Sequence, residues 1–172
     1  MIPITQKAFE TDGVKTIWLI GMPGSGKSTL ATYFDGSDTD ELFTGGSHMS
    51  ATHKDPGAFY DEEERVVIDY TMTNPTGIIA TGGSVVHRDG ACRAMATVPH
   101  SRIVYLYTPL DIIKRRLGDF DARGIVFPPN VGSLDELYQF REPLYRRHCD
   151  YILDTSMQTL EECTNQMSSL LS

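Results

Sequence analysis

The most constraining feature of this sequence is the stretch GMPGSGKST at positions 21–29, which matches the phosphate-loop pattern G-x-x-x-x-G-K-S/T in full. It directly follows the apolar run TIWLI at positions 16–20, which is typical of a buried strand. The glycines let the backbone turn tightly, so that successive N–H groups point inward and form a nest for phosphate oxygens. The sequence therefore predicts a strand, a nucleotide-binding turn and a helix. The alternative is a glycine-rich turn without a ligand.

The side chains of this stretch add the chemistry of a triphosphate site. Lys27 can reach the β- and γ-phosphates, and the Ser28 hydroxyl can ligate Mg²⁺. The N-terminus of the following helix adds the positive end of its dipole. The predicted nucleotide-binding residues of the loop are Gly24, Ser25, Gly26, Lys27, Ser28 and Thr29.

Composition limits the partners of the chain. With 172 residues, 40% of them hydrophobic, it is long enough for one domain with a substantial core. A net charge of −8 disfavours a broad nucleic-acid-binding surface. No apolar run approaches the length of a transmembrane helix. The three cysteines lack C-x-x-C spacing, and the five histidines lack the paired spacing of metal ligands. We expect a cytoplasmic monomer with reduced thiols and no His/Cys metal site, which binds neither nucleic acid nor membrane.

Apolar runs and helical patterns alternate along the rest of the chain. Further strands are predicted at 77–81, 102–107 and 151–154, and helices at 27–34, 59–72, 88–96, 110–117, 134–148 and 157–171. Thr155-x-x-Gln158 is a candidate capping box for the last helix. The range 44–57 is expected to be a loop, and Gly46–Met49 within it resembles a cloning-linker remnant. The alternation predicts an α/β fold with a parallel sheet between two helical layers.

In parallel α/β sheets, ligands bind beyond the carboxyl ends of the strands, and we expect three distant segments to meet there. They are the phosphate loop, Asp38-Thr39-Asp40 and Gly82-Gly83. Asp38 and Asp40 lie two residues apart, so in an extended segment both side chains face the same side. One can hold a metal while the other engages a substrate hydroxyl; the alternative is a solvated acidic turn. Gly82 and Gly83 either let the backbone approach a ligand or form an ordinary turn.

Several motifs follow the phosphate loop in order. They are Asp38-Thr39-Asp40, Phe59-x-x-x-Glu63, Ala80-Thr81-Gly82-Gly83-Ser84-Val85-Val86, Arg141-x-Pro143-Leu144-Tyr145 and Asp150-Tyr151-Ile152-Leu153-Asp154-Thr155. From about Ile17 to the C-terminus, this order resembles the shikimate kinase family. The resemblance implies a single P-loop domain over 1–172, of the nucleoside-monophosphate-kinase type, with a substrate-binding region near 38–75 and a lid near 116–130. It also implies transfer of the γ-phosphate of ATP to a sugar-like hydroxyl.

Carried over by position, the resemblance assigns the donor half of the site. Lys27 and the loop amides would hold the phosphates of ATP, and Ser28 with Asp38 would serve Mg²⁺. Arg123 would reach the transferring phosphate as a catalytic residue, and Arg116 would pack near the adenine. An ordinary surface arginine is the alternative for both.

The resemblance also assigns the acceptor half. Asp40 would bind and orient the acceptor hydroxyl and accept its proton, as a catalytic residue. Gly82 and Gly83 would offer backbone contacts. Arg141 would pair with a carboxylate of the substrate through a bidentate fork, and an ordinary surface arginine is again the alternative. Tyr60 would supply a hydrogen bond to the substrate.

Two departures from the family pattern stand out. Tyr60 occupies the place where the family usually has an arginine that partners the carboxylate of shikimate. One guanidinium–carboxylate contact is worth roughly 1.5–3 kcal/mol, so its loss would weaken shikimate binding about tenfold to a hundredfold. The segment 27–38 is also several residues shorter than the family norm, so the first helix or second strand must be abbreviated.

The sequence therefore predicts an ATP- and Mg²⁺-dependent kinase whose substrate is a small hydroxylated, anionic metabolite, either shikimate or a related compound. A nucleoside monophosphate kinase is the nearest alternative, although Thr81-Gly82-Gly83-Ser84 stands where such enzymes carry Asp-Gly-Phe/Tyr-Pro-Arg. A nucleotide-binding regulatory module without catalysis is the other alternative.

Overall fold

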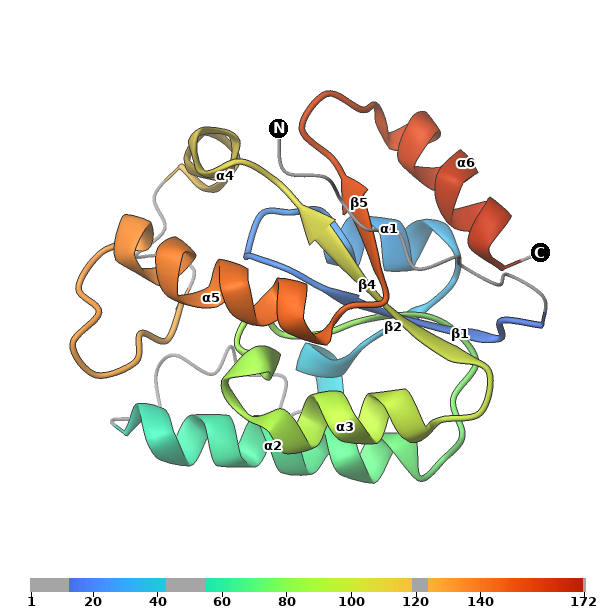
Figure 1. Cartoon of the computed structure of the whole chain (residues 1–172), viewed down its shortest axis with the longest axis horizontal. Coiled ribbons are helices and arrows are strands. Elements are labelled where there is room, and N and C mark those ends of the chain that lie inside the picture. Colours follow the sequence, from blue (N-terminus) through green and yellow to red (C-terminus); the bar gives the residue numbers. More distant parts are fainter. Residues whose placement is uncertain (1–12, 43–54, 119–123, 172) are drawn as a thin grey trace.

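A parallel sheet of five strands in the order β2-β3-β1-β4-β5 organises the fold (Figure 1). The computed structural model describes residues 13–42, 55–118 and 124–171. The strands are β1 (Thr16–Ile20), β2 (Ser37–Asp38), β3 (Gly77–Ala80), β4 (Ser101–Tyr107) and β5 (Tyr151–Asp154). Every strand pair is parallel, which confirms the predicted α/β class. β2 is the only one of these strands that the apolar runs did not predict, because it is only two residues long.

Helices cover both faces of the sheet, as predicted. They are α1 (Lys27–Tyr33), η1 (Thr39–Leu42), α2 (Pro56–Thr71), η3 (Val85–His87), α3 (Asp89–Thr97), α4 (Leu110–Leu117), α5 (Leu134–His148) and α6 (Leu160–Leu170). Figure 1 shows α2 and α3 running side by side on one side of the sheet and α6 on the other. α4 and α5 have the predicted bounds, whereas α2 begins three residues before the predicted helix. It begins there because the Asp55 side chain accepts a hydrogen bond from Gly57 N at 2.9 Å.

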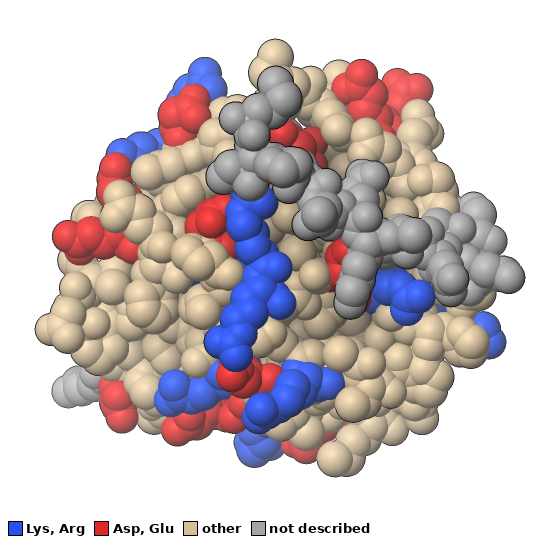
Figure 2. Space-filling view, in the orientation of Figure 1, with Lys and Arg blue, Asp and Glu red and all other residues tan. Residues whose placement is uncertain are grey.

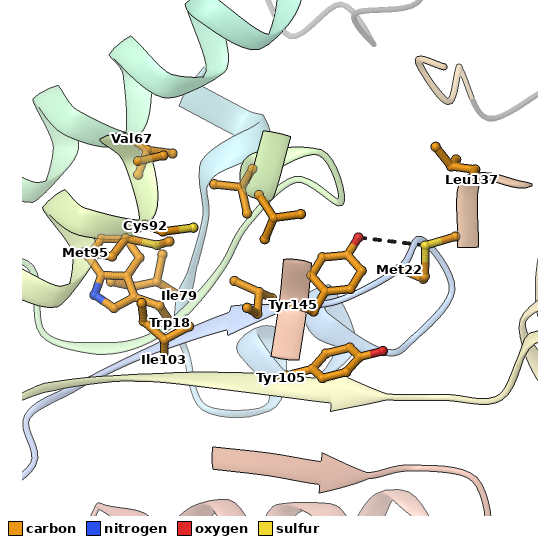
Figure 3. Packing of buried hydrophobic residues seen from close by; sticks show 14 of the residues in the cluster. Trp18, Met22, Val67, Ile79, Cys92, Met95, Ile103, Tyr105, Leu137 and Tyr145 are labelled. Atoms are coloured by element: carbon orange, nitrogen blue, oxygen red, sulfur yellow. Dashed lines mark hydrogen bonds between the residues drawn. The ribbon is translucent and has the colours of Figure 1, made fainter. Parts of the chain in front are cut away.

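Alternating side chains of the central strand fill two separate cores. Trp18 and Ile20 of β1 point into the core beneath α2, α3 and α5, whereas Ile17 and Leu19 point into the core beneath α1 and α6. Figure 3 shows the first core, where Trp18 lies among the side chains of neighbouring strands and helices. All five residues of β1 are buried, because a parallel sheet with helices on both faces leaves its central strand no solvent face.

The connection from α1 to β2 is short and tightly packed. α1 ends after seven residues, and Asp35 adopts a positive φ of 51°. A Cβ on Gly36 would lie 1.9 Å from the carbonyl oxygen of Ile78, so only glycine lets this turn pack against β3. Both the helix and the strand are abbreviated, as the short segment 27–38 predicted. The stretch Asp38-Thr39-Asp40 is not extended as expected, because Asp38 ends β2 and Thr39–Leu42 forms a 3₁₀ turn.

The predicted capping box of the last helix is wrong. α6 begins at Leu160, and its capping box pairs Thr159 with Glu162. The Thr159 hydroxyl accepts a hydrogen bond from Glu162 N at 3.2 Å, and Glu162 Oε2 accepts one from Thr159 N at 2.7 Å. Thr155 is instead buried against Thr108, with 2.6 Å between the two hydroxyl oxygens. Because Thr155 makes these contacts to the end of β4, it is not available to begin a helix.

None of the helices in the described part of the chain is long and apolar enough to cross a membrane. Figure 2 shows basic side chains in a band down the middle of the visible face, with acidic side chains beside it and toward the edges. The predicted cloning remnant, Gly46–Met49, lies outside the described residues.

Candidate active site

A cleft of about 1060 Å³ opens at the carboxyl ends of the strands and brings the three predicted segments together. The predicted site residues that line it are Gly24, Ser25, Gly26, Lys27, Ser28, Thr29, Asp38, Asp40, Gly82, Gly83, Arg116 and Arg141. Tyr60 is not among the described residues that line the cleft. Arg123 lies outside the described residues. The rim of a parallel sheet therefore gathers most of the predicted site.

The phosphate loop encloses Lys27 and holds its ammonium group through backbone carbonyls. Gly26, with φ of 99°, caps α1 in the left-handed conformation that glycine adopts without strain. Lys27 Nζ donates hydrogen bonds to the carbonyl oxygens of Gly21 at 2.9 Å and Met22 at 3.0 Å. Burial lowers the pKa of Lys27 to about 8, although Asp40 and Asp38 oppose this shift. The lysine is thus held beside the space that the loop leaves for phosphate oxygens.

Ser28 and Asp38 form an oxygen pair on the donor side of the cleft. Ser28 Oγ donates a hydrogen bond to Asp38 Oδ2 at 2.6 Å, and Asp38 Oδ1 accepts one from Asp40 N at 3.0 Å. Among the described residues, no three or more His, Cys, Asp or Glu side chains are grouped to hold a metal by themselves. Mg²⁺ usually takes one or two protein oxygens and completes its shell with water and substrate phosphates. The Ser28–Asp38 pair fits that kind of site.

Two carboxyl groups converge on Gly82 in the acceptor half of the cleft. A Cβ at Gly82 would lie 2.1 Å from Glu63 Oε1 and 2.9 Å from Asp40 Oδ1. At the next residue, a Cβ on Gly83 would lie 2.8 Å from Pro23 Cδ and 3.4 Å from Arg141 Nη1. Because Gly82 and Gly83 have no side chains, two carboxyl groups and one guanidinium group can lie directly against their backbone.

Glu63 is a site residue to which the sequence reasoning gave no role. It is 1% exposed, and neither carboxyl oxygen has a hydrogen-bond partner among the described residues. Burial raises the pKa of Glu63 to about 8, although the side chain of Ser84 opposes this shift. The available signal was its position four residues after Phe59, which places an acidic side chain on the buried face of α2.

Arg141 is a buried cation at the far wall of the acceptor half. It is 1% exposed, its Nε donates a hydrogen bond to His87 Nε2 at 2.8 Å, and its Nη2 donates one to the Val126 carbonyl at 3.0 Å. One turn later on α5, the Tyr145 hydroxyl donates a hydrogen bond to the carbonyl of Gly83. α5 thus fixes both the guanidinium and the glycine pair. No sequence pattern singled out His87 or Val126 as neighbours of this arginine.

Tyr60 lies behind this wall instead of facing the cleft. It is 4% exposed, and its hydroxyl donates a hydrogen bond to the Val126 carbonyl at 3.3 Å. Tyr60 and Arg141 therefore share one backbone acceptor.

Arg116 lies on the opposite, nucleotide side of the cleft. Its Nη1 donates a hydrogen bond to the carbonyl of Gly24 at 3.3 Å, and its Nη2 donates one to the carbonyl of Thr155 at 3.2 Å. Gln158, Leu160 and Cys163 line the cleft beyond it. Arg116 thus ties the phosphate loop to the segment between β5 and α6.

Comparisons with known proteins agree with this geometry. The sequence model of the family described as shikimate kinase matches residues 23–172. The shikimate kinase of Paracidovorax citrulli is 33% identical over 153 residues, which cover 80% of this chain and 81% of the relative. That of Acinetobacter baylyi is 26% identical over 168 residues, with 92% of each chain covered.

A solved structure has the same fold over almost the whole length. The shikimate kinase from Acinetobacter baumannii in complex with shikimate superposes with a TM-score of 0.73 at 24% identity and covers 96% of both chains. The family match over 150 residues, together with the cleft that the phosphate loop and the glycine pair line, leads to one assignment. This chain belongs to the shikimate kinase family and is an ATP-dependent small-molecule kinase.

Proposed function

We propose that this chain uses Mg²⁺ and ATP to phosphorylate a hydroxyl group of a small hydroxylated carboxylic acid, shikimate or a compound close to it in shape and charge. One observation carries the proposal. Asp40 and Glu63 meet at Gly82, while Arg141 approaches Gly83, in the cleft that the phosphate loop also lines. Carboxyl groups suit hydroxyl groups, and a buried guanidinium group suits a carboxylate.

The donor half positions the transferring phosphate. Lys27 now donates hydrogen bonds to two loop carbonyls and would donate them to phosphate oxygens when ATP binds. The loop amides and the N-terminus of α1 would bind the remaining phosphate oxygens. Ser28 and Asp38 would hold Mg²⁺, which would neutralise negative charge on the phosphates. Arg116 would lie against the nucleotide, and Arg123 would approach the γ-phosphate. These groups neutralise charge and fix geometry, which phosphoryl transfer mainly requires.

The acceptor half orients the nucleophile. Asp40 would accept a hydrogen bond from the acceptor hydroxyl and then its proton as the phosphate is transferred. Glu63 would bind a second hydroxyl, and Arg141 would bind the carboxylate at the opposite end of the molecule. Gly82 and Gly83 would contact the substrate through their backbone. All these groups come from one chain, so the proposed site is complete without a second copy.

A coupled ADP-release assay over an acceptor panel tests this proposal. The panel contains shikimate, other cyclic and acyclic hydroxy acids, their neutral amides, polyols and nucleoside monophosphates. We expect at least one hydroxy acid to stimulate ADP release well above background, with its amide much weaker. Stimulation only by a mononucleotide, or by no member of the panel, would overturn the proposal.

Single substitutions, measured in the same assay, test the roles proposed for Asp40 and Arg141. Asp40→Asn should lower kcat on the best acceptor by about a hundredfold or more, because the proton acceptor is lost. Arg141→Met should raise KM for the acid about tenfold to a hundredfold and change KM for its amide far less. Arg147→Met is the matched control, because Arg147 lies on the same helix but pairs with Asp89 on the surface.

A further inference from the structure

The environment of Arg141 contains two side chains that the proposed mechanism does not use. His87 accepts a hydrogen bond from Arg141 Nε at 2.8 Å, and the Tyr60 ring stacks on the His87 ring with centroids 4.1 Å apart and planes 26° apart. We propose that His87 and Tyr60 are positioning residues that hold the Arg141 guanidinium in one orientation, with its Nη end turned toward the acceptor. This inference rests on the proposed function, in which Arg141 binds a carboxylate.

The hydrogen bonds of Arg141 define that orientation. A guanidinium group has five N–H donors in a rigid fork. The Nε donor is taken by His87, and one Nη2 donor is taken by the Val126 carbonyl at 3.0 Å. The Nη1 nitrogen lies at Gly83, where a Cβ would be only 3.4 Å away. The hydroxyls of Tyr60 and Tyr145 also lie beside this guanidinium group. The N–H groups not taken by His87 and Val126 belong to Nη1 and Nη2, and this end of the guanidinium group is the one that would meet a carboxylate.

His87 can accept this hydrogen bond only as a neutral imidazole. Arginine always donates, so His87 Nε2 must carry the lone pair, and the ring proton must sit on Nδ1. The charged and titratable groups that face His87 are Arg141 on α5, Arg88 beside it in the chain and Tyr60 on α2. Burial, Arg141 and Arg88 lower the pKa of His87 to about 3. The ring is therefore a neutral acceptor at every pH at which the enzyme would work.

Tyr60 stabilises this arrangement from behind. Its ring packs on His87, and its hydroxyl donates a hydrogen bond to the Val126 carbonyl at 3.3 Å, the same oxygen that Arg141 Nη2 contacts. The Arg88 guanidinium lies 5.9 Å from the centroid of the Tyr60 ring and pairs with Asp61 at 2.6 Å, away from the cleft. Among the described residues that line the acceptor half, Arg141 is thus the only arginine. A single fixed guanidinium group favours an acceptor with one carboxylate over one with two.

Two substitutions at His87 separate positioning from packing. His87→Leu removes the acceptor for Arg141 Nε, whereas the amide oxygen of His87→Gln restores an acceptor near the position of Nε2. With shikimate as the probe acceptor, His87→Leu should raise its KM about tenfold while kcat and the KM for ATP stay close to wild type. His87→Gln should recover most of this loss. Phe140→Leu is the control, because Phe140 lies against His87, with ring centroids 5.3 Å apart, and offers no acceptor.

Substitutions at Tyr60 test whether its ring, stacked on His87, helps to position Arg141. Tyr60→Phe keeps the stacked ring and loses only the hydroxyl, so its KM should change less than that of Tyr60→Leu, which removes the stack. Thermal unfolding of each variant identifies any that fail to fold. Equal KM values for Tyr60→Leu and wild type would overturn the role of Tyr60.

A measurement made without the phosphate-accepting substrate distinguishes the positioning role of His87 from the proposed function. In ¹H–¹⁵N spectra, the Nε–H of Arg141 should be protected from solvent exchange in wild type and His87→Gln, and lose that protection in His87→Leu. The His87 ring nitrogens should show a neutral, Nδ1-protonated imidazole from pH 5 to 8. Unprotected Nε–H in wild type, or an unchanged KM in His87→Leu, would overturn the inference. If wild type does not phosphorylate shikimate while Arg141 Nε–H is protected, the proposed acceptor is at fault and the positioning role stands.

Discussion

Glu63 is a carboxyl group in an environment that disfavours its charge. It is 1% exposed and has no hydrogen-bond partner among the described residues, although Arg141 and Lys27 lie near enough to favour its ionised form in part. Burial therefore raises the pKa of Glu63 to about 8.

This raised pKa predicts how stability depends on pH. The pKa rises from 4.5 in the unfolded chain to about 8 in the folded protein, so the folded state binds more protons between these values. The contribution of Glu63 to stability is therefore complete below about pH 4.5 and is lost as the pH rises toward 8. Glu63→Gln, which stays neutral, should be more stable than wild type at pH 8 by on the order of a few kcal/mol, and the difference should vanish near pH 4.5.

Urea unfolding of both proteins at several pH values measures this difference. Glu161→Gln, which neutralises an exposed carboxyl on α6, controls for the loss of one charge. A difference between Glu63→Gln and wild type that does not change with pH would contradict the prediction.

At the scale of elements, the short connection from α1 to β2 decides where the aspartates lie. α1 has seven residues and β2 has two, and the turn between them packs directly on β3. The pairing of Asp38 with Ala80 in the sheet brings Asp38 to the rim beside Ser28. The 3₁₀ turn that follows then carries Asp40 to Gly82. The tight turn thus lets Asp38 and Asp40 reach the rim of the sheet although the segment 27–38 is short.

Gly36→Ala should break this connection. The added Cβ would lie 1.9 Å from the Ile78 carbonyl oxygen, so backbone on one side must shift. We expect a loss of at least 1–3 kcal/mol, the usual cost of overpacking, and weaker nucleotide binding as Asp38 moves. Gly132→Ala is the control, since its Cβ would meet nothing closer than 3.8 Å. Equal unfolding midpoints for the two variants would show that the turn tolerates a side chain.

The capping box of α6 gives a second prediction for an element. Thr159→Ala removes the acceptor for Glu162 N and should destabilise the protein by about 1 kcal/mol, while Thr159→Ser keeps the acceptor and should lose little. For a chain of this size, 1 kcal/mol lowers Tm by about 2–4 °C. If the alanine and serine variants had the same Tm, the box would contribute nothing.

In the whole molecule, the cleft joins segments that are distant in sequence but meet at one rim of the sheet. The phosphate loop follows β1, Asp38 ends β2, Gly82 follows β3, and Arg141 comes from α5. Each segment belongs to a different element of the folded state, so ligands that contact several of them bind only to the native protein. Ligand binding should therefore raise the stability of the whole molecule.

Thermal unfolding with MgATP tests this expectation. At a concentration of a hundred times Kd, the ligand should add about 2.7 kcal/mol and raise Tm by about 5–10 °C. ATP with a chelator should raise Tm less, because Ser28 and Asp38 would then have no metal to hold. Lys27→Met should show a much smaller shift than wild type when each is compared with its own ligand-free Tm. An equal shift in this variant would mean that the loop binds ATP without its lysine.

The sequence by itself determined the four longer strands, the helices on both faces and the phosphate loop, because each depends on a pattern within one short stretch. It also placed the phosphate loop, Asp38, Asp40 and Gly82 near one another, because the carboxyl ends of parallel strands share a rim. Arg141, on a helix, was assigned to the site only by the resemblance to the family. Only the tertiary structure decided that Tyr60 lies behind Arg141 and that His87 accepts a hydrogen bond from Arg141 Nε. It also decided that Glu63 is enclosed with no hydrogen-bond partner for its carboxyl oxygens among the described residues. His87 and Arg141 are 54 residues apart, and nothing in either local pattern favours their contact. The packing of η3 against α5 creates it, because interactions between distant residues depend on how the elements are arranged.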